Sequence, residues 1–166
     1  MKKLLSAFLI TLFAYNFSAQ TKKDSEFTKK VSADGLFEVK LGQLVQNNAF
    51  SPEVKKLGKK IVEDHIKAND ELKTLAAKKN LEISSSLTKK DQKKYDKIAK
   101  KQGNDFDKTY SKCMVMAHKK AIAAFKAESE KGDDQELKIW ATNTLPVLQS
   151  HENMAKEICK NLKNKK

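Results

Sequence analysis

Arginine is absent from this 166-residue chain, and all 34 of its basic residues are lysine. Proteins that read nucleic acids rely on the bidentate contacts of arginine to phosphates and bases, and single-strand binders add aromatic platforms. Here the lysines are spread over the whole chain, and aromatic residues make up only 7% of it. The composition argues against specific nucleic-acid binding and favours a solvated basic surface, with weak, salt-sensitive binding to anionic surfaces left open.

Long apolar runs are missing everywhere except at the N-terminus, which resembles a Sec-type signal peptide. Two lysines precede an apolar stretch over residues 4–17, and we expect cleavage after Ala19. An uncleaved membrane anchor needs about 18 to 20 apolar residues, and Asn16 interrupts the run too early. We therefore predict a signal peptide over residues 1–19 and an exported protein, periplasmic or secreted, with no transmembrane segment in its mature form.

The expected mature chain, residues 20–166, has the length of a single globular domain and contains only two cysteines. Loss of two lysines with the signal peptide leaves 32 lysines against 21 acidic residues, a net charge of +11. Export permits a disulfide, but helical counting places Cys113 and Cys159 about 10 Å apart along the bundle axis. That separation exceeds the reach of a disulfide, so we favour two buried thiols.

Glycine and proline are also scarce, with five and two residues, and the apolar residues follow a helical period nearly throughout. No strand-like alternation occurs, so the sequence predicts an all-α domain. We expect four long helices and a short extra helix in the connection between the second and third. This pattern is typical of a four-helix bundle. The expected long helices cover about 24–48, 52–79, 104–131 and 133–162, and the short one covers about 88–101.

Local signals mark several helix ends. Ser51 is an expected N-cap before Pro52, and Thr88 with Asp91 resembles a capping pair. Asn104 or Asp105 is the expected cap of the third long helix, and Gly132 ends it. Pro146 lies inside the fourth, where its missing N–H and its ring predict a kink before His151.

Polar residues interrupt the inward stripe of every long helix. His65 takes a stripe position four residues after Ile61, and His118 and His151 do the same on the third and fourth helices. The first helix contributes Glu38, with Asp34 one turn earlier. At about 1.5 Å per residue, these groups all lie near the middle of helices about 40 Å long, so they could meet.

Two interpretations of this layer remain open. Three imidazoles and a carboxylate suit a transition metal such as zinc, iron, copper or manganese. The alternative is a non-enzymatic envelope-structural or interaction module, in which a hydrogen-bonded cluster only fixes helix register. Asp64, next to His65, is a further candidate ligand, as is Asp34. Met114 and Met154 would permit a copper-like site, but core packing explains both more simply.

Catalytic signatures are missing. No serine stands in a Gly-x-Ser-x-Gly elbow, neither cysteine has a convincing base, and no glycine-rich phosphate loop is present. These absences favour a binding protein over an enzyme.

Several motifs together give a family resemblance over about residues 27–160. They are Glu38, "DH" at 64–65, "FDKTY" at 106–110, "HKKAIAAF" from His118 and "TLPVLQSH" ending at His151. With these motifs the chain resembles the exported bacterial family catalogued as domain of unknown function 4142. The resemblance implies a ferritin-like four-helix bundle.

The chain departs from the ferritin pattern that this grouping suggests. Di-iron sites of ferritin-like proteins use Glu-x-x-His pairs, but the residues three before the histidines are Val62, Val115 and Leu148. Too few carboxylates remain to bridge two irons. We expect a single-metal site at Glu38, His65, His118 and His151, serving metal binding, storage or stress protection, or a layer that has lost its metal.

Overall fold

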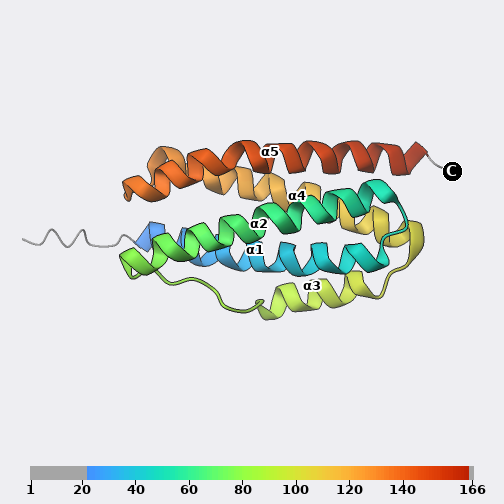
Figure 1. The fold of residues 1–166 in the computed structure, drawn as a ribbon, viewed down its shortest axis with the longest axis horizontal. Coiled ribbons are helices and arrows are strands. Elements are labelled where there is room, and N and C mark those ends of the chain that lie inside the picture. Colours follow the sequence, from blue (N-terminus) through green and yellow to red (C-terminus); the bar gives the residue numbers. More distant parts are fainter. Residues whose placement is uncertain (1–21, 165–166) are drawn as a thin grey trace, which may run out of the picture.

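A computed structural model of the chain describes residues 22–164, which form five α-helices and no strand (Figure 1). The prediction of an all-α chain is confirmed, and the helix bounds lie within about two residues of the expected ones. The predicted signal peptide, 1–19, lies outside the described residues. None of the described helices is long and apolar enough to cross a membrane. The helices are α1 (Lys22–Asn48), α2 (Pro52–Lys79), α3 (Lys89–Ala99), α4 (Gly103–Lys131) and α5 (Gln135–Asn164).

The helix ends follow the predicted capping in part. Thr88 caps α3, because its hydroxyl oxygen accepts the N–H of Asp91 at 3.1 Å. Ser51 is the N-cap residue of α2, as predicted, but its hydroxyl donates to Glu53 at 2.7 Å and makes no side-chain cap bond. The prediction for α4 is wrong. Its N-cap is Gln102, which makes no side-chain cap bond, and the helix already begins at Gly103, before the two expected caps.

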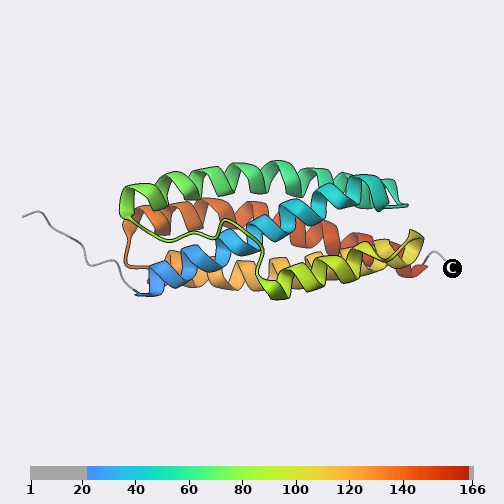
Figure 2. The ribbon, with the colours of Figure 1, turned by 90° about the horizontal axis from the view of Figure 1, so that it is seen from below.

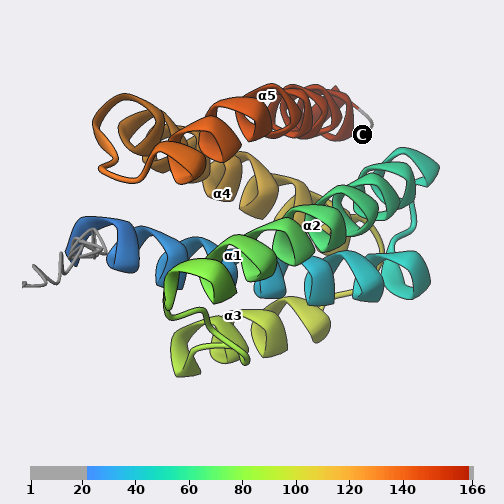
Figure 3. The same cartoon turned by 60° about the vertical axis from the view of Figure 1, so that its left-hand side comes forward.

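Two helical hairpins form the body of the bundle. α1 pairs with α2 and α4 pairs with α5, and α2 lies against α5 where the hairpins meet (Figure 3). The short helix α3 lies along α1 and α4 on another side of the bundle, as Figure 2 shows. α5 continues as one helix through Pro146. Cys113 and Cys159 are free thiols, the first buried and the second partly buried.

Glycines allow α1 and α2 to approach closely. A Cβ atom built on Gly42 would lie 2.7 Å from a methyl of Val62, and one built on Gly58 would lie 2.6 Å from a methyl of Val45. Both distances are shorter than carbon atoms tolerate, so any larger residue would push the helices apart. This contact positions α2, and therefore His65, close to α1.

The core consists of two apolar clusters rather than one. The first contains Leu41 of α1, Ile61 of α2, Met114 of α4 and Ala155 of α5. The second contains other residues of the same four helices. On α2, α4 and α5 the histidine lies between the residues of one cluster and those of the other, and on α1 Glu38 lies next to Phe37, where the first cluster begins. Members of the second cluster include Val31, Leu72, Phe125 and Leu148.

Each hairpin turn is held by a buried carboxylate of the other hairpin. Asp107 of α4 is fully buried and accepts the backbone N–H groups of Phe50 (3.1 Å) and Ser51 (2.7 Å) in the α1–α2 turn. Asp24 of α1 accepts those of Asp133 (3.1 Å) and Asp134 (3.0 Å) in the α4–α5 turn. Charge-assisted bonds of this kind satisfy helix-start N–H groups and fix the axial position of one hairpin against the other.

Replacement of Asp107 tests this bracing. The Asp107→Ala variant leaves two backbone N–H groups without their acceptor, so we expect the free energy of unfolding to fall by about 2 to 4 kcal/mol. Asp105→Ala is the matched control, because Asp105 is exposed and pairs only with Lys101 on the described part of the chain, and its cost should stay below about 1 kcal/mol. Urea unfolding measures both, and equal costs would contradict the proposed bracing.

Candidate metal centre

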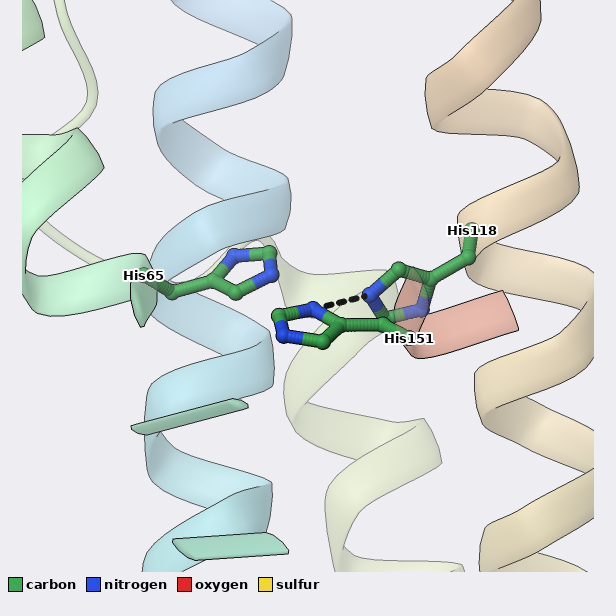
Figure 4. Close-up of side chains that lie close together, drawn as sticks. All are labelled: His65, His118 and His151. Atoms are coloured by element: carbon green, nitrogen blue, oxygen red, sulfur yellow. Dashed lines mark hydrogen bonds between the residues drawn. The ribbon is translucent and has the colours of Figure 1, made fainter. Parts of the chain in front are cut away.

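Four polar side chains meet inside the bundle, one from each long helix. They are Glu38 of α1, His65 of α2, His118 of α4 and His151 of α5. Glu38 is 3% exposed, and His118 and His151 are fully buried. The side chain of His65 is 12% exposed. Figure 4 shows the three imidazoles pointing toward one another from three helices.

Hydrogen-bond partners determine which ring nitrogens carry protons. Nδ1 of His118 lies 3.0 Å from the carbonyl oxygen of Met114, and Nε2 of His151 lies 2.8 Å from a carboxylate oxygen of Asp64. A carbonyl and a carboxylate only accept, so these two nitrogens are the donors. In neutral rings, Nε2 of His118 and Nδ1 of His151 are then left with lone pairs. They lie 3.2 Å apart and face each other (Figure 4).

His65 adds a third nitrogen to this arrangement. Its Nε2 lies 3.2 Å from Oε2 of Glu38, but this buried nitrogen forms no hydrogen bond with any of residues 22–164. The same Glu38 oxygen lies 3.8 Å from Nε2 of His118. The centre of the layer is therefore a buried group of nitrogen and oxygen atoms that lacks at least one positive charge or proton.

Burial opposes an extra proton on the histidines. It lowers the pKa of His65 from 6.5 to about 4, and burial together with the nearby His118 lowers that of His151 to about 4 as well. The pKa of His118 is lowered for the same reason. Burial also raises the pKa of Glu38, because burial favours neutral forms and the neutral form of an acid is the protonated one. Burial thus disfavours an extra proton on any of the three imidazoles, whereas it favours the neutral, protonated form of Glu38.

Asp64 differs from Glu38 because its pKa is lowered rather than raised, which favours the ionised carboxylate. Burial would raise its pKa, but hydrogen bonds from Lys60 and His151 outweigh this and hold the pKa below its usual value. The amine of Lys60, one turn earlier on α2, lies 2.9 Å from Asp64. Asp64 therefore orients His151 from outside the layer, as carboxylates do behind metal-bound histidines.

The spacing of the donor atoms suits one metal ion. One nitrogen from each of the three histidines lies within 4.8 Å of the others. Two nitrogens bound to the same tetrahedral ion at 2.0–2.1 Å would be about 3.3 Å apart, close to the 3.2 Å between His118 and His151. A cavity of about 40 Å³ borders Glu38, Asp64 and His65, which leaves room for a water molecule beside the layer.

The remaining candidates take different places. Asp34 does not reach the histidines: its carboxylate pairs with Lys30 at 2.6 Å and its side chain is 44% exposed. Met114 is buried in the first apolar cluster and Met154 packs against it. Core packing therefore accounts for both methionines.

Sequence reasoning missed two participants. Lys60 could have been found from its i,i+4 spacing to Asp64. Tyr110 is fully buried, its hydroxyl has no partner among the described residues, and burial with the nearby Glu38 charge raises its pKa well above the usual value. No local pattern in the sequence marks that hydroxyl as unpaired.

Comparison with known protein families shows to which family the chain belongs. The family described as domain of unknown function (DUF4142) matches residues 14–158. The chain belongs to the DUF4142 family. The resemblance that the sequence motifs indicated is thereby confirmed, and all four residues of the layer fall within the DUF4142 match. No curated protein matches the chain.

A solved structure resembles the fold of this DUF4142 chain. It is the crystal structure of a DUF305 fragment from Deinococcus radiodurans, with a TM-score of 0.75 and 8% sequence identity. The match covers 86% of this chain and 98% of the fragment. At this identity the likeness concerns the helical fold alone.

The histidine layer should make the stability of the metal-free protein depend on pH. Between pH 6.5 and about 4, His65 and His151 are protonated in the unfolded chain but neutral in the folded protein. Because the unfolded chain then binds more protons, the free energy of unfolding falls as the pH falls. Glu38, with its raised pKa, acts in the opposite direction and offsets part of the loss. Urea unfolding of EDTA-treated protein at pH 7, 5.5 and 4.5 measures this loss.

A double variant isolates the histidine contribution. In His65→Leu/His151→Leu the loss between pH 7 and 4.5 should be smaller than in the wild type by at least about 1 kcal/mol. Parallel pH profiles for the two proteins would show that these histidines are not buried in their neutral form.

Proposed function

We propose that this DUF4142 chain is an exported, ferritin-like four-helix bundle that binds one transition-metal ion through its buried layer. The observation that carries the proposal is the contact between Nε2 of His118 and Nδ1 of His151, which lie 3.2 Å apart. In neutral rings each of these nitrogens has a lone pair, and burial lowers the pKa of both rings. A metal cation satisfies both nitrogens at once. It also supplies a partner for the unpaired Nε2 of His65 and a counter-charge for Glu38.

The ligand set indicates the class of metal. Three neutral imidazoles with one carboxylate suit zinc, iron or copper rather than calcium or magnesium, which prefer oxygen ligands. The fully occupied hydrogen bonds behind two of the rings, to Met114 and Asp64, support this reading because metal-bound histidines need such partners.

The same ligand set argues against a di-iron oxidase. Such sites bridge two irons with several carboxylates. Among the described residues, two carboxylates contact the imidazoles, and Asp64 is bound to the outer nitrogen of His151, which leaves Glu38 alone at the centre of the layer. We therefore propose metal binding, storage or protection against metal stress, without turnover. The apolar N-terminal run supports export to the periplasm or medium. The high net positive charge would allow weak binding to anionic surfaces there.

A structural role for the layer is the second candidate. The observation that favours it is the position of the layer between two apolar clusters, where a polar group on every long helix would select one register. Replacement of Glu38 and the three histidines by apolar residues would then leave the fold intact, and no metal would bind the wild type. Metal analysis therefore distinguishes the two candidates.

Metal content is the first test of the proposal. Purified protein lacking residues 1–19, loaded with zinc, iron(II) or copper and then desalted, should retain about one ion of at least one of these metals per chain. His65→Ala and His151→Ala should each reduce the retained metal severely. Stoichiometry is measured by inductively coupled plasma mass spectrometry, and negligible retention by the wild type for every metal would refute metal binding.

Asp64 and Asp34 provide a matched pair for a finer test. Each lies four residues after a lysine that pairs with it, but only Asp64 touches a histidine. Asp64→Asn should weaken metal affinity by about 10- to 100-fold, because the amide orients His151 less strongly. Asp34→Asn should leave the affinity unchanged. Competition with a chromogenic chelator measures both, and equal effects would contradict the outer role of Asp64.

A further inference from the structure

A lysine-lined groove lies along the seam between α1 and α4. It has a volume of about 620 Å³, and α3 supplies its third wall. Its lining includes Phe37 and Glu38 of α1 and Cys113 and Ala117 of α4. The groove exists because α3 has 11 residues, against 27 in α1 and 29 in α4, so it cannot cover the whole seam (Figure 2).

Positive charge converges on this groove from three helices. Six lysines line it, against three acidic residues. Among the six, Lys90, Lys97, Lys112 and Lys120 form no ion pair with any residue in the range 22–164. The lysines are Lys30, Lys90, Lys94, Lys97, Lys112 and Lys120.

The acidic residues of the lining neutralise little of this charge. Asp34 is already paired with Lys30, and Asp91 is bound to the hydroxyl of Thr88 in the cap of α3. Glu38 faces the histidine layer, with a pKa that burial raises. Charges of one sign around a concave, low-polarity site focus the electrostatic field and attract counter-ions.

We propose that this groove binds a small, multivalent oxyanion that carries several phosphate or carboxylate groups. Its volume lies within the usual range for small-molecule sites, about 300 to 1,000 Å³. Lysine ammonium groups recognise phosphate and carboxylate as point charges. The one aromatic ring of the lining, Phe37, is covered by the amine of Lys94 at 4.8 Å, so no free platform is left for a nucleobase. The groove is recessed between helices, a shape that suits a soluble anion better than a flat membrane. This proposal does not rest on the metal proposed above, although Glu38 borders both sites.

Isothermal titration with inorganic tripolyphosphate, and separately with citrate, tests the groove. The protein is used without added metal and at an ionic strength of about 0.1 M, where the Debye length is about 10 Å. The groove variant is Lys97→Gln/Lys112→Gln/Lys120→Gln, in which all three side chains are exposed and free of ion pairs within the described residues, so the fold should be retained. We expect its affinity for at least one of the anions to fall by about tenfold or more, as the loss of three nearby charges implies.

A charge-matched control separates the groove from net charge. Lys56→Gln/Lys67→Gln/Lys73→Gln removes three exposed lysines of α2, which contributes nothing to the groove. Its affinity should change by less than about threefold, since distant exposed charges are largely screened. Equal weakening by the two triple variants would overturn the proposal, because binding would then follow net charge alone. Failure of the wild type to bind either anion would overturn it as well.

Discussion

The rest of the structure depends on the contact between His118 and His151, because their neutral rings direct two unprotonated nitrogens at each other. His118 donates from its other nitrogen to a carbonyl, and His151 donates from its other nitrogen to Asp64. What remains is a lone pair on each ring, 3.2 Å apart, in a site where burial makes protonation costly. Leaving such groups unsatisfied costs free energy. A positive charge at this point, supplied by a metal ion, would satisfy the whole layer.

The rest of the fold keeps the four polar side chains of the layer at one height. The polar layer divides the core into two apolar clusters, so sliding one helix would bury a histidine or Glu38 among aliphatic side chains. Asp24 and Asp107 tie the turn of each hairpin to the opposite hairpin. Close contact at Gly42 and Gly58 sets the distance between α1 and α2. These restraints act far from the layer, yet they determine which ring atoms meet.

The sequence predicts the helices well because their ends and faces are local properties. The capping pair at Thr88 and the stripe position of His65 depend on residues within two turns. Long-range contacts explain the failures. Ser51 takes the expected N-cap position but makes no side-chain cap bond, because Glu53 accepts its hydroxyl while Asp107, 56 residues away, accepts its backbone N–H. Local pattern likewise cannot separate Asp34 from Asp64, which both follow a lysine by four residues. Only packing against α5 places one of them beside a histidine.

Nitrogen-15 NMR of the histidine rings tests the central claim most directly. At pH 7 the metal-free protein should show three neutral imidazoles, with the proton on Nδ1 of His118 and on Nε2 of His151. Zinc or another bound metal should then shift the signals of Nε2 of His118 and Nδ1 of His151. An imidazolium at pH 7 in the metal-free protein, with both nitrogens of His151 protonated and unchanged by added metal, would contradict the account. It would show that a shared proton, not a metal ion, satisfies the layer.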